Sequence, residues 1–393
     1  MKNVVIFCGG RGAAGLVRSM QGKYNLSLIV NAYDDGHSTG RLREIFKILG
    51  PSDCRKNAEY LLSKDLDESI KSYFGTRYAN CNNVSEVINA LELTISELNS
   101  LKVNEFSTMI LKWFIESISQ AVETLKKLSG RTSLKDCSLM NLVLTNEVIR
   151  EQSFQGGVDT FVSGFGIKDK IILNSDENFA LMGLTQSGHI LFSEGDIVEG
   201  RSSEIIDELY LIPYPDYDYV KEKIHLSHDF YEQVKILREN NCIPSLASGV
   251  EEAINNADII IYASGTANSS LYPTYLTKGL SQVIARSSAK KMMLVNIGAD
   301  YETPDYKASD FIKKTFYFLG SHGSFAYDNL TSYRLIDTVF VNQPVGIDRH
   351  HIVFDKMDPV FSTVNVVSGN FEDPDHKGRH SESFIEMINN LLK

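Results

Sequence analysis

A glycine-rich turn near the N-terminus has residue types that suit phosphate binding. Gly10, Gly12 and Gly15 fit the pattern G-x-G-x-x-G between a predicted strand and a predicted helix. Small residues let the backbone approach a diphosphate, and the N-terminus of a helix offers unpaired N–H donors. Asp34 stands at the end of the next predicted strand, where an acid can bind a ribose hydroxyl. Taken alone, the pattern fits a dinucleotide site and an ordinary tight turn about equally well.

A second polar loop begins at Asp34-Asp35 and argues against a simple nicotinamide site. Carboxylates, hydroxyls, arginines and glycines are mixed over residues 34–43 and 50–57. A ribose-binding acid needs no such loop, so the mixture favours a site for phosphate, with or without a divalent cation. The alternative for each residue is helix capping or pairing with a neighbour. The candidates in this loop are Asp34, Asp35, Ser38, Arg41, Arg43, Asp53, Arg55 and Asn57.

Residues 263–273 form a third candidate loop, which follows a predicted buried strand and is rich in small hydroxyl side chains. In open α/β sheets, ligands bind beyond the carboxyl ends of the strands, so this loop and the first are expected at one crevice. Ordinary helix capping is the alternative for each serine. The candidate phosphate-binding residues here are Gly265, Thr266, Ser269 and Ser270.

The elements that must position these loops follow from the hydrophobic pattern. Continuous apolar runs are typical of parallel strands buried on both faces, and they occur at residues 4–8, 26–32, 259–262, 291–296 and 338–342. Three- and four-residue apolar spacing predicts helices, which we expect up to residue 20, over 83–128, before 259 and over 383–392. Short strands at 171–173 and 179–184, with a hairpin turn at 187–190, predict a small β-rich excursion from the main sheet.

We therefore predict a Rossmann-like, three-layer α/β/α fold with a mostly parallel sheet. Because strands of one sheet occur near both ends of the chain, residues 1–393 are expected to form a single α/β unit. Residues 83–130 are predicted to be a helical insertion or cap within it. Helices that simply cover the sheet are the alternative.

Composition limits the classes of partner. The chain has 393 residues, a formal net charge of −11 and a pI of about 5.4, which argues against large nucleic-acid or anionic-membrane surfaces. The five scattered cysteines contain no C-x-x-C, which predicts reduced thiols and a cytoplasmic location. No apolar run approaches the roughly 18 residues that span a bilayer. We expect no nucleic acid and no membrane as partners.

Together, the three loops resemble the CofD/YvcK-like family. The matching stretches, in chain order, are Gly9 to Gly12, Asp34 to Arg43, Gly50 to Asn57, Met140 to Leu142, Ser264 to Pro273, and Asn296 with Glu302-Thr303. The block from Asp34 to Arg43 is the most specific and is closest to the YvcK branch. Arg11 and His37 stand where the family's pattern has threonine and glycine, so the first two loops carry more positive charge and bulk than the pattern.

The resemblance implies roles for these residues. Phosphates would bind Gly9, Gly10, Arg11, Gly12 and the third loop, and Asp34 or Asp35 would bind Mg²⁺ or orient an acceptor hydroxyl. Arg41, Arg43 or Arg55 would neutralise the transferred group. Polar contacts to the ligand would come from Ser38, Asp53, Asn57, Asn141 and Asn296.

Three functions remain open. The first is a CofD-like transferase; CofD-type members resemble enzymes that move a phospholactyl group from a guanosine diphosphate adduct to a deazaflavin hydroxyl, with a divalent metal. The second is a YvcK-like binder of UDP-sugars that regulates carbon or cell-wall metabolism without catalysis. The third is an NAD-dependent oxidoreductase. In each case the partner is a small nucleotide diphosphate compound, and a homodimer is an open alternative to a monomer.

Overall fold

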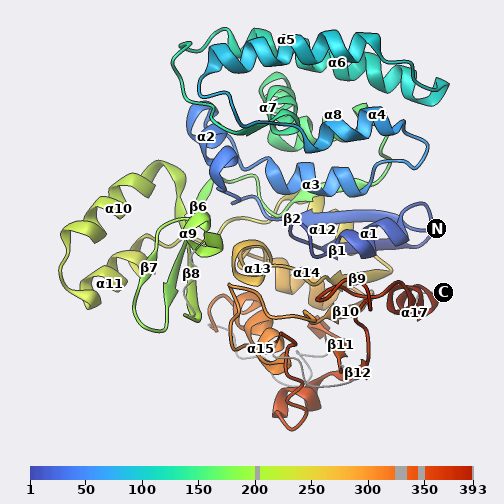
Figure 1. Cartoon of the computed structure of the whole chain (residues 1–393). Coiled ribbons are helices and arrows are strands. Elements are labelled where there is room, and N and C mark those ends of the chain that lie inside the picture. Colours follow the sequence, from blue (N-terminus) through green and yellow to red (C-terminus); the bar gives the residue numbers. More distant parts are fainter. Residues whose placement is uncertain (200–203, 324–333, 344–349, 392–393) are drawn as a thin grey trace. The chain divides into compact units, whose positions relative to one another are not determined.

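The computed structural model describes residues 1–199, 204–323, 334–343 and 350–391. The chain forms two compact units. Unit 1 comprises Met1–Tyr33 and Ile172–Lys393, and unit 2 comprises Asp34–Ile171 (Figure 1). The sequence predicts that residues 1–393 fold as one unit, and two compact units can still fold together. The single unit stays a prediction.

A seven-stranded parallel sheet with helices on both sides is the main sheet (Figure 1). The strand order is β12-β11-β10-β9-β1-β2-β5. The bounds are β1 (Asn3–Phe7), β2 (Asn25–Val30), β5 (Lys170–Leu173), β9 (Ile259–Tyr262), β10 (Lys290–Leu294), β11 (Thr338–Asn342) and β12 (Asn365–Gly369). The central strands are apolar and buried on both faces, as their runs of β-branched residues require. The predicted fold class is confirmed.

Two strands differ from the prediction. The strand expected at residues 171–173 in the β-rich excursion is β5 of the main sheet, where Asn174 N–H continues the pairing by donating to the Val30 carbonyl at 3.0 Å. A three-residue apolar run carries no information about which sheet it joins. The edge strand β12 was not predicted, because it is partly exposed and contains Asn365 and Ser368.

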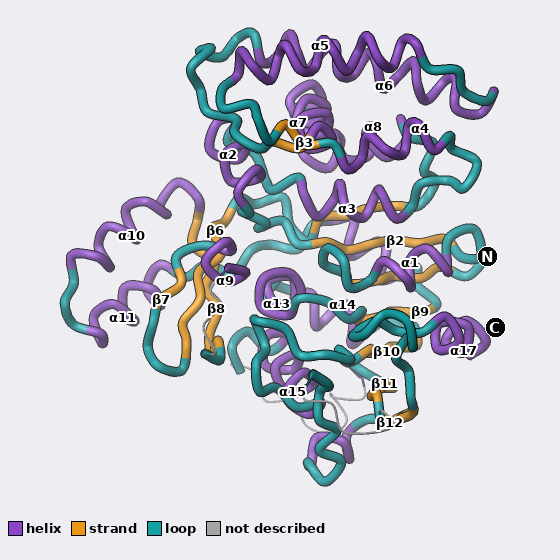
Figure 2. The backbone as a smooth tube through the Cα atoms, viewed as in Figure 1, coloured by secondary structure: helices purple, strands orange, loops and turns teal. Residues whose placement is uncertain are grey.

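The helices of the main-sheet region pack in pairs: α1 on α17, α12 on α14, and α13 on α15. Figure 2 shows α1 and α17, from the two ends of the chain, lying side by side. Near them, Tyr24 Oη donates to the Asn389 carbonyl at 3.2 Å. The bounds are α1 (Ala14–Met20), α12 (Ser248–Asn255), α13 (Tyr272–Tyr275), α14 (Leu280–Arg286), α15 (Ala308–Leu319) and α17 (Glu382–Leu391), with short turns η3 (Ala267–Leu271) and η4 (Pro359–Thr363). The helices expected up to residue 20, before 259 and over 383–392 are confirmed as α1, α12 and α17, except that residue 392 lies outside the described residues.

A three-stranded antiparallel sheet forms the predicted β-rich excursion. Its order is β7-β6-β8, and the β6–β7 hairpin turns at Gly188, which has a φ of 91°. Helices α10 and α11 bury Val220, Ile224 and Leu237 against it. The bounds are β6 (Phe179–Thr185), β7 (Ile190–Leu191), β8 (Ile206–Pro213), η2 (Tyr214–Asp216), α9 (Glu194–Glu199), α10 (Tyr217–Leu226) and α11 (Phe230–Asn240).

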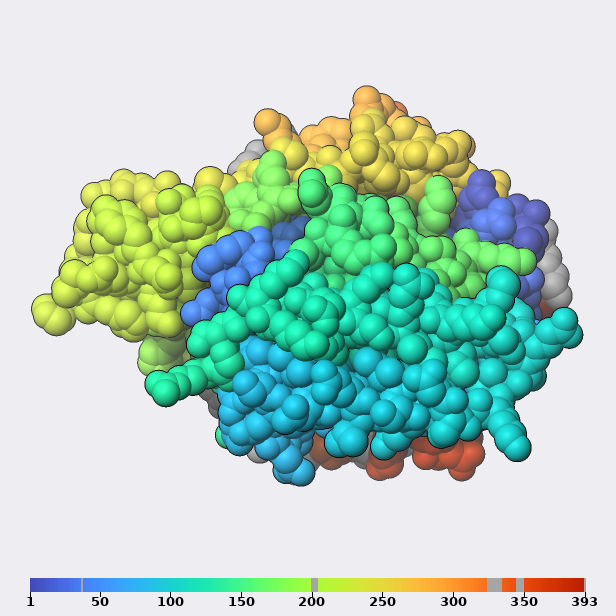
Figure 3. Space-filling model, turned by 90° about the horizontal axis from the view of Figure 1, so that it is seen from above, coloured from blue at the N-terminus to red at the C-terminus, as the bar shows by residue number. Residues whose placement is uncertain are grey.

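Unit 2 is mainly helical. The predicted helical stretch is confirmed as α5 and α6, which pack on each other and begin at capping asparagines, Asn83 and Asn104. Figure 3 shows the surface that this helix pair presents, in blue-green. The bounds are α2 (His37–Phe46), α3 (Ser52–Tyr60), α4 (Glu68–Lys71), η1 (Ser72–Gly75), β3 (Arg77–Tyr78), α5 (Val84–Ser100), α6 (Glu105–Leu125), β4 (Cys137–Ser138), α7 (Leu139–Glu151) and α8 (Phe154–Gly164).

Within the described part of the chain, no helix has both the length and the apolar character needed to cross a membrane.

Candidate functional site

The first and third loops meet in unit 1, because β1 and β9 are neighbouring parallel strands. A Cβ atom added to Gly12 would lie 2.3 Å from the Ser264 carbonyl oxygen and 2.5 Å from Gly265 Cα. A Cβ atom on Gly9 would lie 2.5 Å from Ser270 Cβ. These glycines therefore allow the backbones of the two loops to touch. The expectation that the two loops lie together holds for their backbones.

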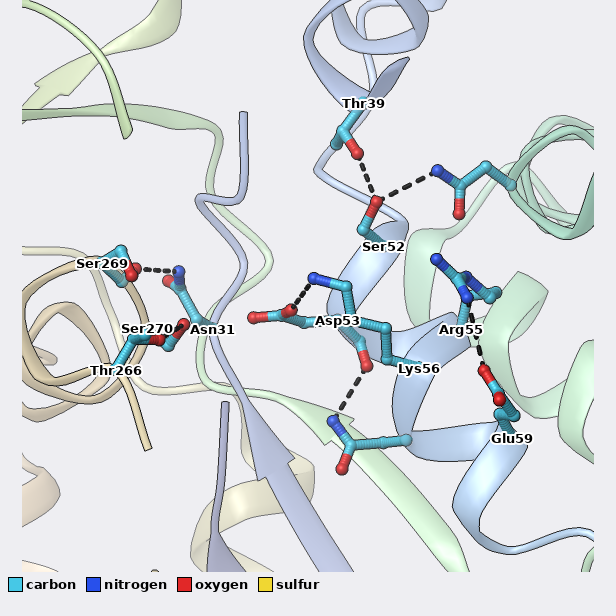
Figure 4. Close-up of polar contacts among 12 residues, drawn as sticks. Asn31, Thr39, Ser52, Asp53, Arg55, Lys56, Glu59, Thr266, Ser269 and Ser270 are labelled. Atoms are coloured by element: carbon cyan, nitrogen blue, oxygen red, sulfur yellow. Dashed lines mark hydrogen bonds and ion pairs between the residues drawn. The ribbon is translucent and has the colours of Figure 1, made fainter. Parts of the chain in front are cut away.

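Asn296, beyond the end of β10, braces the third loop. Its Oδ1 accepts a hydrogen bond from Gly265 N–H at 3.0 Å, and its Nδ2 donates to the Gly265 carbonyl at 2.9 Å. On the other side, Asn31 follows β2 and donates from Nδ2 to the Ser269 carbonyl at 2.9 Å (Figure 4). Both side chains hold the loop. Asn296 was predicted to contact the ligand, but its amide is engaged by Gly265.

Glu302 fills an anion-binding turn in the third loop. Its Oε2 accepts from the backbone N–H groups of Asn268 and Ser269, both at 2.9 Å, and its Oε1 accepts from Ser269 Oγ at 2.5 Å. Burial, helped by the nearby charge of Asp300, raises the pKa of Glu302 to about 7. Ser269, predicted to bind phosphate, thus already donates to an internal carboxylate. Glu302 was missed as a functional residue, although it belongs to a motif that matched the family.

The turn Gly10-Arg11-Gly12 is the part of this cluster that remains open. Arg11 and Gly12 are exposed, and no ion pair joins Arg11 to another described residue. Thr266 is also exposed, with its Oγ1 3.0 Å from Ser270 Oγ. Arg11 can offer a phosphate its guanidinium, the turn can offer backbone N–H groups, and Thr266 of the third loop can offer a hydroxyl.

In unit 2, the two arginines that follow the double acid have separate partners. Arg43 is fully buried; its Nη1 donates to the Asp34 carbonyl at 3.1 Å and lies 3.8 Å from Asp35 Oδ1. Arg41 donates from Nη1 to the Lys135 carbonyl. Arg43 thus supports the backbone of the acidic turn, and Arg41 is bound to the segment before β4.

A chain of hydroxyl and amide groups joins α2, α3 and α7. Ser52 Oγ shares a hydrogen bond with Thr39 Oγ1 and accepts another from Asn141 Nδ2 at 3.0 Å (Figure 4). Ser38 Oγ accepts from Ser138 N–H at 3.3 Å. Asn141 Oδ1 is buried and has no hydrogen-bond partner among the described residues. That oxygen is an available acceptor at a predicted binding residue.

The charged residues of α3 are largely paired with one another. Lys56 Nζ lies 3.0 Å from Asp53 Oδ1; burial raises the pKa of Asp53, against the lowering effect of Lys56 (Figure 4). Arg55 Nη1 lies 3.4 Å from Glu59 Oε2. Asn57 Nδ2 donates to the Asp53 carbonyl at 2.9 Å. Sequence reasoning missed Lys56, which neutralises Asp53.

Asp34 is the carboxylate in unit 2 that is best suited to a cation. Its Oδ2 is buried and has no hydrogen-bond partner among the described residues. In the described ranges, no group of three or more His, Cys, Asp or Glu side chains could hold a metal ion. Mg²⁺ is often bound by one or two carboxylates together with substrate phosphates. The residues present therefore fit a cation that arrives with a phosphorylated ligand, but do not form an all-protein metal site.

Comparisons with known proteins identify relatives of this chain in sequence and in structure. A gluconeogenesis factor of Halalkalibacterium halodurans is 25% identical over 314 residues, which cover 79% of this chain and 72% of that protein. The gluconeogenesis factor of Bacillus subtilis is 23% identical over 341 residues, covering 86% and 78%. The crystal structure of a member of the upf0052 family from Bacillus halodurans has the same fold, with a TM-score of 0.68, 19% identity and complete coverage of both chains. The family model of 2-phospho-L-lactate transferase CofD matches residues 4–353, and the protein therefore belongs to the CofD family.

Proposed function

We propose that this protein binds a nucleotide diphosphate compound at the turn Gly9–Gly12 of unit 1, and that it acts as a CofD-like transferase. The observation that supports this most directly is the exposed guanidinium of Arg11, which lies between two glycines at the carboxyl end of β1 and makes no ion pair with the residues that the structure describes. A diphosphate needs this combination of positive charge and closely approachable backbone. Membership of a family described as a transferase supports the reaction class.

The residues take different roles in the proposal. Arg11 pairs with the diphosphate, and the backbone of Gly10 and Gly12 approaches it. Asn296 and Glu302 hold the third loop, so their contribution to binding is indirect. In unit 2, we propose Asp34 as the residue that binds Mg²⁺ together with a phosphorylated ligand, with Asp35 as the second candidate. Bound Mg²⁺ would neutralise negative charge on the phosphates.

The second candidate is a sugar-nucleotide sensor without catalysis, and a specific observation favours it. Arg41 and Arg43, which were expected to neutralise the transferred group, donate to the backbone carbonyls of Lys135 and Asp34. A transferase relies on cations at the transferred group, so two arginines that are bonded to the protein's own backbone favour a sensor over a transferase. Relatives named gluconeogenesis factors are consistent with either function.

The test is titration calorimetry of the purified protein with GDP, a UDP-sugar and NAD, each with and without Mg²⁺. Arg11→Ala should weaken the tightest of the diphosphates about 10- to 100-fold, as expected for one charge-assisted hydrogen bond. The matched control is Arg131→Ala, which removes an exposed guanidinium that makes no ion pair among the described residues. Equal affinity in wild type and Arg11→Ala, or binding of none of the three compounds, would contradict the proposal.

A further measurement separates transfer from sensing. The purified protein is incubated with the bound nucleotide and a deazaflavin-type acceptor alcohol. A transferase breaks the diphosphate P–O–P bond, joins the distal phosphoryl group to the acceptor oxygen with loss of the hydroxyl proton, and releases the nucleoside monophosphate, whereas a sensor returns the nucleotide intact. Mass spectrometry of the nucleotide distinguishes the two.

A further inference from the structure

A histidine outside the family match contacts the third loop of unit 1. His380 precedes α17, and its Nδ1 lies 3.4 Å from Ser264 Oγ. The family model ends at residue 353, so this contact comes from a part of the chain that the model does not cover. Ser264 is also the residue whose carbonyl oxygen packs against Gly12. The contact therefore reaches the turn where the diphosphate is proposed to bind.

We propose that His380 is a positioning residue, which orients the Ser264 hydroxyl so that it donates a hydrogen bond to a phosphate oxygen of the ligand. The proposal rests on the proposed function, because it assigns a specificity-determining pair to the same site. With His380 Nδ1–H donating to Ser264 Oγ, the serine proton is left free for an acceptor outside the protein. A phosphate oxygen is such an acceptor.

The surroundings of His380 suit this role because they fix the ring. The imidazole stacks on Phe384 of α17, with ring centroids 4.8 Å apart, and Phe384 stacks in turn on Phe371 at 4.2 Å. The backbone of His380 pairs with Glu372 in an antiparallel bridge. Burial lowers the pKa of His380 to about 4, so the ring is neutral near pH 7 and offers one donor and one acceptor nitrogen.

The main chain around Ser264 is held in addition to the contact with His380. Ser264 lies two residues after the end of β9, its carbonyl lies against Gly12, and the N–H and the carbonyl of the next residue, Gly265, are both bonded by the amide of Asn296. The main chain is thereby fixed, and the remaining freedom of Ser264 is the rotation of its hydroxyl. One hydrogen bond from a rigid imidazole is enough to remove that freedom.

The experiment measures affinity of the full chain for inorganic pyrophosphate by calorimetry. The variants are Ser264→Ala, His380→Ala, the double variant, His380→Asn and the control His376→Ala, an exposed histidine of the same segment. Ser264→Ala and His380→Ala should each weaken binding about three- to tenfold, the effect of one neutral hydrogen bond. The double variant should bind no more weakly than Ser264→Ala, since His380 acts through that hydroxyl.

Two further readouts separate positioning from general support of the fold. His380→Asn keeps a donor on a short side chain, so it should restore most of the affinity. In ¹⁵N spectra of the free protein, Ser264→Ala should shift the His380 Nδ1 signal, whereas the control His376→Ala should not. Both readouts remain informative if His380→Ala proves unstable.

The outcomes are distinct. Affinity that falls in Arg11→Ala but is unchanged in Ser264→Ala would overturn the role of the pair and leave the proposed function in place. Losses that add in the double variant would also overturn it, because the two side chains would then act independently. If wild type binds GDP or a UDP-sugar but not pyrophosphate, the assignment of His380 fails and the proposed function stands; if wild type binds none of these compounds, both fail.

Discussion

Replacing Glu302 by glutamine should remove a large pH-dependent contribution to the stability of unit 1. The carboxylate is buried and accepts hydrogen bonds from Asn268 N–H, Ser269 N–H and Ser269 Oγ. These three bonds favour the charged form, but burial and the charge of Asp300 outweigh them. Glu302 is therefore protonated more readily in the folded protein than in the unfolded chain.

The magnitude follows from the two pKa values. The pKa of Glu302 rises from the ordinary 4.5 to about 7 on folding. Between these values the folded state binds a proton that the unfolded state does not. The contribution to stability is fully present below the unfolded pKa and is lost as the pH rises through about 7. At about 1.4 kcal/mol for each pKa unit, the total is about 3 kcal/mol.

The assay is urea unfolding of wild type and Glu302→Gln at pH 5, 6, 7 and 8, followed by far-UV circular dichroism. The single tryptophan, Trp113, lies in α6 of unit 2, so its fluorescence reports separately on that unit. Because pH 5 already lies above the unfolded pKa of 4.5, the difference in unfolding free energy between the two proteins should change by about 2.5 kcal/mol from pH 5 to pH 8, with wild type losing stability at high pH. Asp300→Asn should reduce the change. Parallel curves for wild type and Glu302→Gln would refute the argument.

Two further predictions, each with a companion variant, test the close approach of Gly12 to the third loop and the ion pair between Lys56 and Asp53. Gly12→Ala places a Cβ atom 2.3 Å from the Ser264 carbonyl oxygen, so it should destabilise unit 1 by about 1–3 kcal/mol. Gly265→Ala meets its nearest atom at 3.9 Å and should leave the thermal midpoint nearly unchanged; equal midpoints for the two variants would contradict the close approach. Lys56→Met leaves the buried carboxylate of Asp53 without its cation and should cost about 3–5 kcal/mol in urea unfolding followed by tryptophan fluorescence. Adding Asp53→Asn should recover most of the loss, and a double variant as unstable as Lys56→Met would argue against the pair.

Much of the fold could be predicted, because buried parallel strands carry a strong local signal. Residues 259–262 and 338–342 are continuous apolar runs, and they coincide with β9 and β11. The signal fails where a strand is short or lies at an edge. Residues 171–173 could join either sheet, and β12 exposes part of each face, so its alternation is weak.

The candidate site was predicted less completely, because the partner of a polar side chain is set by residues distant in sequence. The glycines at 9 and 12 were identified from spacing, and the structure shows the close approach that they allow. The partner of Ser269 is Glu302, and the partner of Asn296 is Gly265, each more than thirty residues away in the chain. Nothing local in a serine or an asparagine shows whether its hydrogen bonds are available to a ligand.

The internal use of these polar groups bears on the choice between transferase and sensor. The third loop gives two backbone donors and a hydroxyl to Glu302, and Arg43 gives its guanidinium to the turn at Asp34. Arg11, which is proposed to act on the ligand's charge, makes no ion pair within the described part of the chain. One guanidinium is sufficient to bind a diphosphate, but phosphoryl-type transfer requires more positive charge as the reaction proceeds. A transferase built on this turn must therefore depend on a further cation such as Mg²⁺, whereas a sensor need not. Ligand affinity that is independent of Mg²⁺ would thus favour the sensor.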